Sequence, residues 1–546
     1  MTGLRAFSGP RRSRHPLAVG LILAGLAVAG AVCGQDWRVA VTAGSVILAV
    51  LLARFPFAAL LAVTATLFVG TPSLRITHAP GVVTQFFPAM LLLPSLLAGY
   101  LARAAAGSPH RPPPRRRNLS PLAPFVAAVV VLHLLALGWA PDTAFALGQL
   151  ATLAFDALFF TVLVAAVSDA RRLRAVLFTV LASAVAVCAT MVCGALYDWA
   201  GSIPLGRGVS LTFELFSEER WGRIGGLCSA NQAGGFLVFA TFVALGLSRL
   251  YRRFARAGLC LLALLFLTFV VVSGSRGAIL GFLGACGAFL LLHPASRQRL
   301  LSRVVLLILA LTLAIAAGKP SFIDRMLVGF GYSGPLLFSE KKNTSESASN
   351  VSGSGARFRM WKDALSVMAD RPEYLLLGLG PGGFIWHTHE PEVHSLWLAF
   401  FFDLGLAGGL TGILGLATLL LAVGQALRRA PPGPERTLFL AVVVAALAEL
   451  GLHSGIDHDL TSPVSRFAWL YVAILAAALQ VVRRCPARME DAYDDPAPHP
   501  APVPGPAVPS GGAGAAFQPA FPAPLPSPAR AGNAGARSPH PGRARA

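Results

Sequence analysis

Six arginines lie in polar segments that separate apolar runs between residues 200 and 400 of this chain. They are Arg220, Arg223, Arg276, Arg325, Arg357 and Arg359. A guanidinium group is planar, stays charged in partly dry surroundings and presents paired N–H donors that match phosphate oxygens. Any one of these residues taken alone can be a solvated or snorkelling side chain. As a set they indicate that the chain binds an anionic ligand.

Arg276 has the most informative surroundings of the six. It directly follows Ser273-Gly274-Ser275 and stands at the start of an apolar run that is expected to be a helix. The first turn of a helix has backbone N–H groups without intrahelical partners, and these groups favour an anion. The sequence therefore predicts that Arg276 contacts the anionic ligand.

His394 lies two residues before a long apolar run, so it is expected at the surface of the apolar phase. A histidine with an unperturbed pKa of about 6.5 can accept a proton near neutral pH. The alternative is that this histidine is an interfacial anchor, and the residue type leaves both open. His387 and His389 are nearby rivals, and either Glu390 or Glu392 can orient whichever histidine acts.

A second group of polar residues lies near the C-terminal end of the apolar part. It consists of His453, Asp457, His458 and Asp459. This group can line an acceptor site, but we expect it mainly to order its loop. Asp156, Asp403 and Glu449 fall inside apolar runs, where a charge is costly in lipid, so we expect them to face the protein interior as packing partners.

The elements that must position these residues are membrane-spanning helices. The sequence is 55% hydrophobic and 13% charged, which does not fit a globular domain that must cover itself with polar surface. Roughly 12–14 apolar runs have the length of a span, the second and third being short enough for a re-entrant pair. The runs are 17–34, 39–52, 57–69, 83–101, 122–139, 145–167, 175–196, 233–246, 257–272, 278–292, 304–317, 396–423, 438–452 and 467–482.

The formal net charge of +20 is distributed as short basic clusters between the runs. When fourteen spans are threaded through a bilayer, all of these clusters fall on one side, which the positive-inside rule makes cytoplasmic. This pattern explains the charge by topology and not by nucleic-acid binding. Both termini are then cytoplasmic, the first run is a retained helix, and the six arginines face outward.

The sequence divides into an N-terminal segment, 1–16, then an N-terminal set of transmembrane helices, 17–200, and a second transmembrane region, 201–482. The second region contains one long external loop, 318–393, whose latter half has a helix-forming pattern. The Pro/Ala/Gly-rich tail, 487–546, lacks the apolar content to fold and is expected to be disordered. The predicted fold class is therefore all-α, polytopic and transmembrane.

Several motifs in this order resemble the O-antigen ligase and polymerase superfamily. They are Arg220-Trp-Gly-Arg223 with Asn231, Ser273-Gly-Ser-Arg276-Gly, Arg357-Phe-Arg359-Met-Trp361, Gly378-Leu-Gly380-Pro-Gly-Gly383, His394-Ser-Leu and Asp403-Leu-Gly405-Leu-Ala-Gly408. The likeness covers roughly residues 210 to 480. Two positions depart from the family pattern, because the usual His-Asn reads His394-Ser395 and a proline before the upstream asparagine is replaced by Ala230.

The resemblance implies a membrane glycosyltransferase whose donor is a polyprenyl-pyrophosphate-linked glycan and whose acceptor is a glycan, lipid A core or protein. It implies that His394 is the catalytic base and that Arg276, with Arg223 and either Arg357 or Arg359, holds the pyrophosphate. Arg220, His389, Glu390, Asp457 and His458 would be supporting residues. No metal and no cofactor are implied, because no external carboxylate cluster resembles a Mg²⁺ site.

The predicted function is transfer or polymerisation of glycan on the outer face of the bacterial cytoplasmic membrane. The alternative from another class is a transporter or flippase of lipid-linked glycans, in which the outer arginines would form a substrate vestibule. A transporter is expected to show paired half-repeats and broken helices. The sequence shows no clear internal repeat, and the long one-sided loop with His and Arg favours an enzyme.

Overall fold

The structure of the chain is a computed structural model. It describes residues 55–68, 73–79, 82–86, 89–90, 92, 120–196, 200–206, 209–214, 216–218, 223–292, 353–388, 393, 395–430, 433–454 and 465–484. The predicted runs 17–34, 39–52 and 304–317 and the tail 487–546 lie outside these residues.

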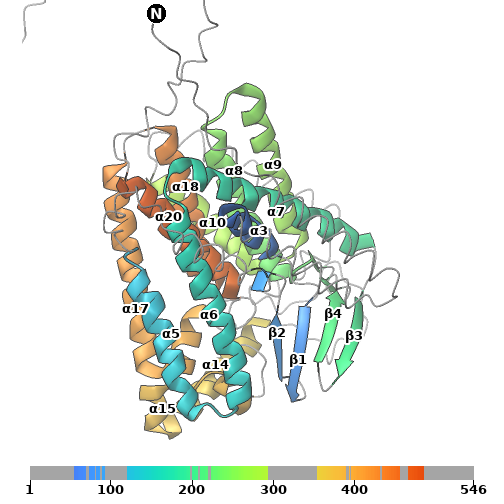
Figure 1. Ribbon diagram of the computed structural model, residues 1–546, viewed down its shortest axis with the longest axis vertical. Helices are drawn as coiled ribbons and strands as arrows, with labels where there is room; N and C mark the ends of the chain where they lie inside the picture. Colours follow the sequence, from blue (N-terminus) through green and yellow to red (C-terminus); the bar gives the residue numbers. More distant parts are fainter. Residues whose placement is uncertain are drawn as a thin grey trace, which may run out of the picture. The chain divides into compact units, whose positions relative to one another are not determined.

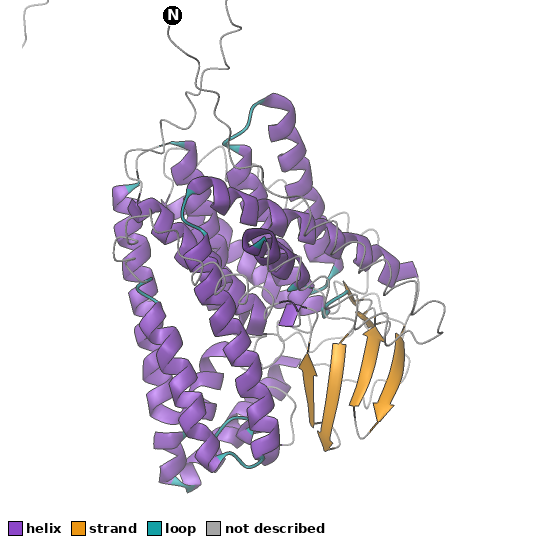
Figure 2. Cartoon of the chain, in the orientation of Figure 1, coloured by secondary structure: helices purple, strands orange, loops and turns teal. Residues whose placement is uncertain are grey.

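The described part of the chain is mainly helical (Figures 1 and 2). Helices lie over ten of the predicted runs, and within the described residues seven helices are long and apolar enough to cross a membrane. This confirms a polytopic helical membrane protein. The ten are α3 (Pro56–Thr66), α5 (Ala123–Ala136) with η1 (Leu137–Trp139), α6 (Thr143–Ala166), α7 (Ala170–Leu196), α8 (Ala230–Ser248), α9 (Arg253–Val272), α10 (Arg276–Leu292), α17 (Leu396–Arg429), α18 (Pro434–Ala448) with η4 (Glu449–His453), and α20 (Ser465–Arg484).

Helix α8 lies at the centre of the packing. Almost all of its residues are buried, and it packs against α7, α9, α10 and α18. A helix that is apolar on every side needs neighbours on every side, which explains its central place. Helices α5, α6, α17 and α20 form a second group, in which α5 lies beside both α6 and α17 (Figure 1).

The described residues also contain strands, which the sequence analysis did not anticipate (Figure 2). Four strands form an antiparallel sheet in the order β2-β1-β4-β3, and β5 pairs with β6. The strands are β1 (Ser73–Ala79), β2 (Val82–Phe86), β3 (Ala200–Gly206), β4 (Val209–Glu214), β5 (Phe216–Glu218) and β6 (Arg223–Gly226).

Strand β2 corrects one detail of the predicted spans, because the run 83–101 was expected to be helical from its first residue. Residues 82–86 instead pair with β1, whose other edge pairs with β4. The segment Val-Val-Thr-Gln-Phe contains β-branched and aromatic residues that favour a strand, and Pro80-Gly81 before it is typical of a turn. Hydropathy alone does not distinguish such a strand from the start of a span.

The latter half of the predicted external loop is helical, as its pattern indicated. It contains α14 (Gly353–Asp370), α15 (Pro372–Leu377) and α16 (Gly383–Thr388), and α14 packs on both of the shorter helices. Helix α15 also packs against α17, so the segment from α14 to α16 is attached directly to a long membrane helix.

Helix α17 is broken at Gly405, whose φ of 60° and ψ of −150° are not helical. The break leaves carbonyl groups without their intrahelical donors. The backbone N–H of Leu379 donates to the Phe402 oxygen (2.6 Å), and the N–H of Gly380 donates to the Asp403 oxygen (3.1 Å). In a membrane such groups must be satisfied by protein, so the segment after α15 stabilises the break.

Gly405→Ala is expected to destabilise the protein by roughly 1–3 kcal/mol, because a non-glycine residue is strained at positive φ. An added Cβ would also collide with the Leu376 carbonyl and the Gly378 N–H. Thermal unfolding in detergent measures the change. The control is Gly424→Ala in the same helix, where a Cβ meets nothing within 4 Å. Equal melting temperatures for the two variants would contradict the role of the break.

Candidate functional site

The sequence-predicted site residues divide into two sets. His394, Arg220, His389, Glu390, Asp457 and His458 lie outside the described residues, and so does Glu392. Arg223 lies in β6, Arg276 begins α10, and Arg357 and Arg359 lie in α14, with Arg359 exposed. The main contacts of α14 are with α15 and α16, whereas α10 packs mainly on α8, α18 and η4. The structure therefore places the predicted arginines on two separate groups of helices.

The turn before Arg276 is a buried, hydrogen-bonded structure. Gly274 has a φ of 63°, a conformation that glycine adopts without strain. The Ser273 hydroxyl donates to the Val270 carbonyl at 2.6 Å and accepts from the Ser275 N–H at 3.3 Å. The Ser275 hydroxyl accepts from the Ala278 N–H at 3.2 Å, so Ser275 caps α10. Arg276, half-buried, is the first residue of that helix, as the sequence predicted.

The segment that carries Arg223 leads into the helix that supports this turn. After β6, Ser229 and Gln232 form a capping box at the start of α8, with bonds of 3.4 Å from the Gln232 N–H and 3.2 Å from the Ser229 N–H. Gly234, in the second turn of α8, packs so closely on Ser273 that an added Cβ would lie 2.7 Å from the Ser273 oxygen. Strand β6, which carries Arg223, and the turn before Arg276 therefore both pack on α8.

Two helix N-termini account for the departures from the family pattern. Ala230 is the first residue of α8, a position where proline is well tolerated because its N–H would have no partner. Ser395 is the N-cap of α17, where its hydroxyl accepts from the Leu398 N–H at 3.4 Å, and asparagine is equally favourable as an N-cap. Both departures therefore keep the local role of the residue they replace.

The residues on each side of His394 are held in place. The Trp361 indole N–H of α14 donates to the Val393 carbonyl at 2.8 Å, and Val393 is buried. Ser395 is also buried and caps α17. Of the two residues that flank position 394, Val393 is thus bonded to α14 and Ser395 begins α17.

His387 is exposed and lies in a small polar cluster on α16 and α15. Its ring is 5.8 Å from the ring of Tyr374, and the Arg371 guanidinium donates to the Tyr374 hydroxyl at 3.2 Å. Partial burial and the charge of Arg371 lower the pKa of His387 below its usual value. A lowered pKa keeps this imidazole neutral at neutral pH, so it is a chemically reasonable rival base.

The predicted intramembrane carboxylates are buried. The exposed fractions of Asp156, Asp403 and Glu449 are 1%, 4% and 0%, which confirms that they face the protein interior. Asp156 of α6 interacts electrostatically with the buried Arg466 of α20. An opposite charge within reach lowers the cost of each charge in a low-dielectric interior.

Sequence reasoning missed the partner of Glu449. His453, which was grouped with external polar residues, is completely buried, and its Nδ1 lies 2.8 Å from the Glu449 Oε2. Both residues belong to the π-helical turn η4. The signal that could have identified the pair is its i, i+4 spacing at the end of an apolar run.

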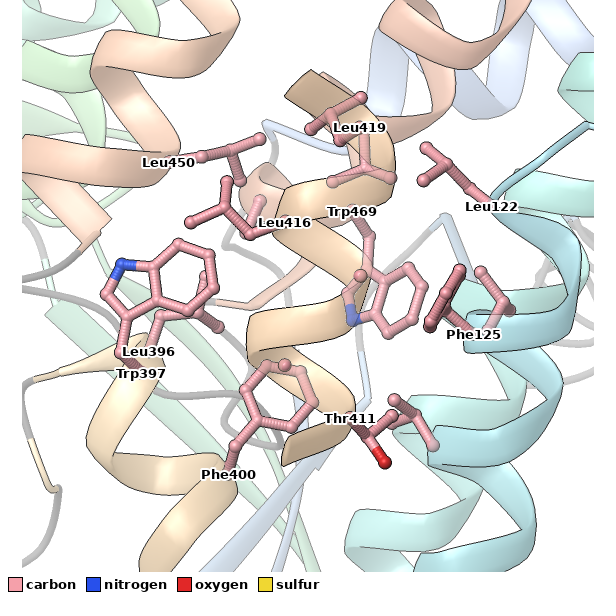
Figure 3. Close-up of a pocket in the computed structure, with 16 residues that line it drawn as sticks. Leu122, Phe125, Leu396, Trp397, Phe400, Thr411, Leu416, Leu419, Leu450 and Trp469 are labelled. Atoms are coloured by element: carbon pink, nitrogen blue, oxygen red, sulfur yellow. The ribbon is translucent and has the colours of Figure 1, made fainter. Parts of the chain in front are cut away.

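An apolar cavity of about 110 Å³ lies between α5, α17 and α20 (Figure 3). Its lining includes Phe125 of α5, Trp397 and Phe400 of α17, and Trp469 of α20, and Thr411 is the most polar side chain in it. Leu396 and Trp397, the two residues that follow the Ser395 cap, are part of its lining. Because its lining is almost entirely apolar, the cavity offers favourable contacts to a hydrocarbon group.

Within the part of the chain that the structure describes, no group of three or more His, Cys, Asp or Glu side chains could hold a metal ion. The polar side chains near the starts of α8, α10 and α17 and on α15 and α16 are mainly arginine, serine and histidine.

Comparison with protein families matches residues 261–413 to the family described as O-Antigen ligase. The matched region runs from α9 through the Arg276 turn, α14 and the His394 segment to the first half of α17, and it confirms the resemblance inferred from the sequence motifs. No curated protein matches the chain.

Among solved structures, one match is a chain from work titled "Structural coordination of polymerization and crosslinking by a peptidoglycan synthase complex". It is 18% identical, with coverage of 67% of this chain and 98% of that chain and a TM-score of 0.38.

Proposed function

This chain is related to the O-antigen ligases through residues 261–413, and on that premise we propose that it transfers or polymerises glycan from a polyprenyl-pyrophosphate-linked donor. The acceptor is a glycan, lipid A core or protein. The reaction takes place at the outer face of the bacterial cytoplasmic membrane, with both termini on the cytoplasmic side.

The observation that carries this proposal is the apolar cavity whose lining includes Leu396, two residues after His394 in the sequence. A lipid-linked donor has a hydrocarbon tail and a charged pyrophosphate joined at one point. The cavity between α5, α17 and α20 suits the tail, and the N-terminal end of α17 suits the junction between tail and head group. In this arrangement His394, as the general base for the acceptor hydroxyl, lies beside the sugar that is transferred.

In the proposed reaction the acceptor hydroxyl oxygen forms a bond to the anomeric carbon while the bond from that carbon to the pyrophosphate oxygen breaks. His394 accepts the hydroxyl proton, and polyprenyl pyrophosphate leaves with the electron pair. Arg276 stabilises the charge that grows on the leaving group, with Arg223 and Arg357 or Arg359 as helpers. Arg220, His389, Glu390, Asp457 and His458 are supporting residues.

A transporter of lipid-linked glycans is the second candidate, and the break in α17 favours it, because broken helices are common in transporters. The carbonyl groups freed by this break, however, accept bonds from Leu379 and Gly380. These carbonyl groups are thus bonded to protein, so the break has a structural role. Reconstituted vesicles that move labelled donor across the bilayer without forming product would favour the transporter.

Arg276→Lys is expected to lower the rate of glycan transfer by about 10²-fold, since lysine keeps the charge but loses the paired donors that stabilise the leaving group. The assay follows product formed by purified protein from a polyprenyl-pyrophosphate-linked glycan and an acceptor. Arg249, at the C-terminal end of α8, provides the matched control as Arg249→Lys. Wild-type rates in both Arg276→Lys and Arg276→Ala would exclude this residue from the reaction.

His394→Ala is expected to lower transfer by roughly 10²–10⁴-fold, the usual contribution of a general base. His387→Ala and His389→Ala should each cost much less. The wild-type rate should fall on the acid side of neutrality, because protonation removes the base, and a rate profile from about pH 5.5 to about pH 8.5 measures this. A large loss in His387→Ala with normal turnover in His394→Ala would assign the base to α16.

Gly415→Leu is expected to raise the KM for a long-chain donor several-fold by filling the cavity. Gly415 lines the cavity, and a Cβ there makes only ordinary contacts with the Phe125 ring at 3.7 Å, so the helix should tolerate the change. A donor with a short prenyl chain should be affected less. Equal effects on both donors would place the lipid tail elsewhere.

A further inference from the structure

The buried pair of Glu449 and His453 has no part in the reaction described above. The Nδ1 of His453 lies 2.8 Å from the Glu449 Oε2, and both side chains are completely inaccessible to solvent. At this distance the two atoms share a hydrogen bond. An ionisable residue inside a membrane domain is by default a candidate for function, because lipid does not solvate its charge.

Stability alone does not account for the pair. Replacement of a buried ion pair by apolar side chains of similar volume is often neutral or stabilising. The local backbone is also unusual, because Glu449–His453 forms a π-helical turn in which the Ser454 N–H donates to the Glu449 carbonyl. Single π-helical turns inside α-helices frequently occur at functional sites.

Two neighbouring helices leave space for the pair by having glycine where they approach it. A Cβ on Gly235 of α8 would collide with both the imidazole and the carboxylate. A Cβ on Gly281 of α10 would lie 3.0 Å from the Glu449 Oε1 and 3.6 Å from the His453 Cβ. The pair therefore packs closely against both α8 and α10 at points where each helix has glycine.

The same glycines connect the pair to Arg276. Gly234, next to Gly235, packs on Ser273 and Ser275 of the turn that precedes α10. Gly281 follows Arg276 by five residues, about 7.5 Å along the helix axis. A movement of the pair against Gly235 and Gly281 would therefore shift α10 relative to α8 and move Arg276 with it.

We propose that Glu449 and His453 are positioning residues that hold the start of α10, and with it Arg276, at the place required for glycan transfer. This inference depends on the proposed function of Arg276. The interaction that Arg276 makes strengthens in the transition state, so a small displacement should lower kcat more than it raises KM. A misplacement of 1 Å can cost 10²-fold in rate.

The main test is the double variant Glu449→Leu/His453→Leu, which removes both polar groups and leaves no unpaired buried charge. We expect an unchanged or higher melting temperature, a kcat lowered by about 10–100-fold and a donor KM within about threefold of wild type. Glu449→Gln, which can still hydrogen-bond to the imidazole, should keep most of the rate. His133→Leu is the control, because His133 is a buried histidine of α5 bonded to the Val129 carbonyl at 2.9 Å.

If the double variant does not fold, a second pair of variants tests the positioning role of Glu449 and His453. Gly281→Ala should push the pair by a few tenths of an ångström and lower kcat several-fold, whereas Gly287→Ala in the same helix meets nothing within 4 Å and should not. Hydrogen exchange of residues 273–278 supplies a measurement independent of turnover and should be faster in Gly281→Ala. Unchanged kcat and unchanged exchange would overturn the positioning role, whereas a wild-type protein without transfer activity would overturn the proposed function instead.

Discussion

The requirement that buried backbone groups find partners within the protein controls the architecture around the candidate site. Hydrocarbon offers no hydrogen bonds, so a membrane helix can depart from α geometry only where other protein groups replace the lost bonds. At Gly405 the replacement comes from the N–H groups of Leu379 and Gly380. Since these residues follow α15, the break in α17 attaches the segment from α14 to α16 to this membrane helix.

Serine residues satisfy open N–H groups at the starts of three helices by the same rule. Ser229, Ser275 and Ser395 cap α8, α10 and α17, and each satisfies an N–H group that the helix leaves open. The caps determine where each helix begins, and two of the candidate residues, Arg276 and His394, adjoin a cap. Arg276 starts α10, and His394 immediately precedes the cap of α17. Differences from the family pattern at Ala230 and Ser395 are tolerated because the cap geometry, and not the exact residue, is what these positions require.

Buried charge and buried apolar space have complementary roles in this membrane domain. Glu449 and His453 share a buried hydrogen bond, and Asp156 and Arg466 are buried within electrostatic reach of each other, in an interior where an isolated ion would be very costly. The cavity between α5, α17 and α20 is lined by apolar and aromatic side chains and is suited to hydrocarbon. In the function that we propose, an amphiphilic donor joins these two environments at the beginning of α17.

The amino-acid sequence by itself determined the membrane class, the positions of ten described helices, the interior location of Asp156, Asp403 and Glu449, and the place of Arg276 at a helix start. These features depend on local length, hydropathy and capping, which can be read without knowing the neighbours. Only the tertiary structure decided that residues 82–86 form a strand, that α17 breaks at Gly405, and that His453 turns inward to Glu449. Each of these depends on a contact with a distant segment, namely β1 and β4 for the strand, residues 376–380 for the break, and Gly235 and Gly281 for the buried pair. Such contacts have no local signature because the groups that make them come together only when the helices pack.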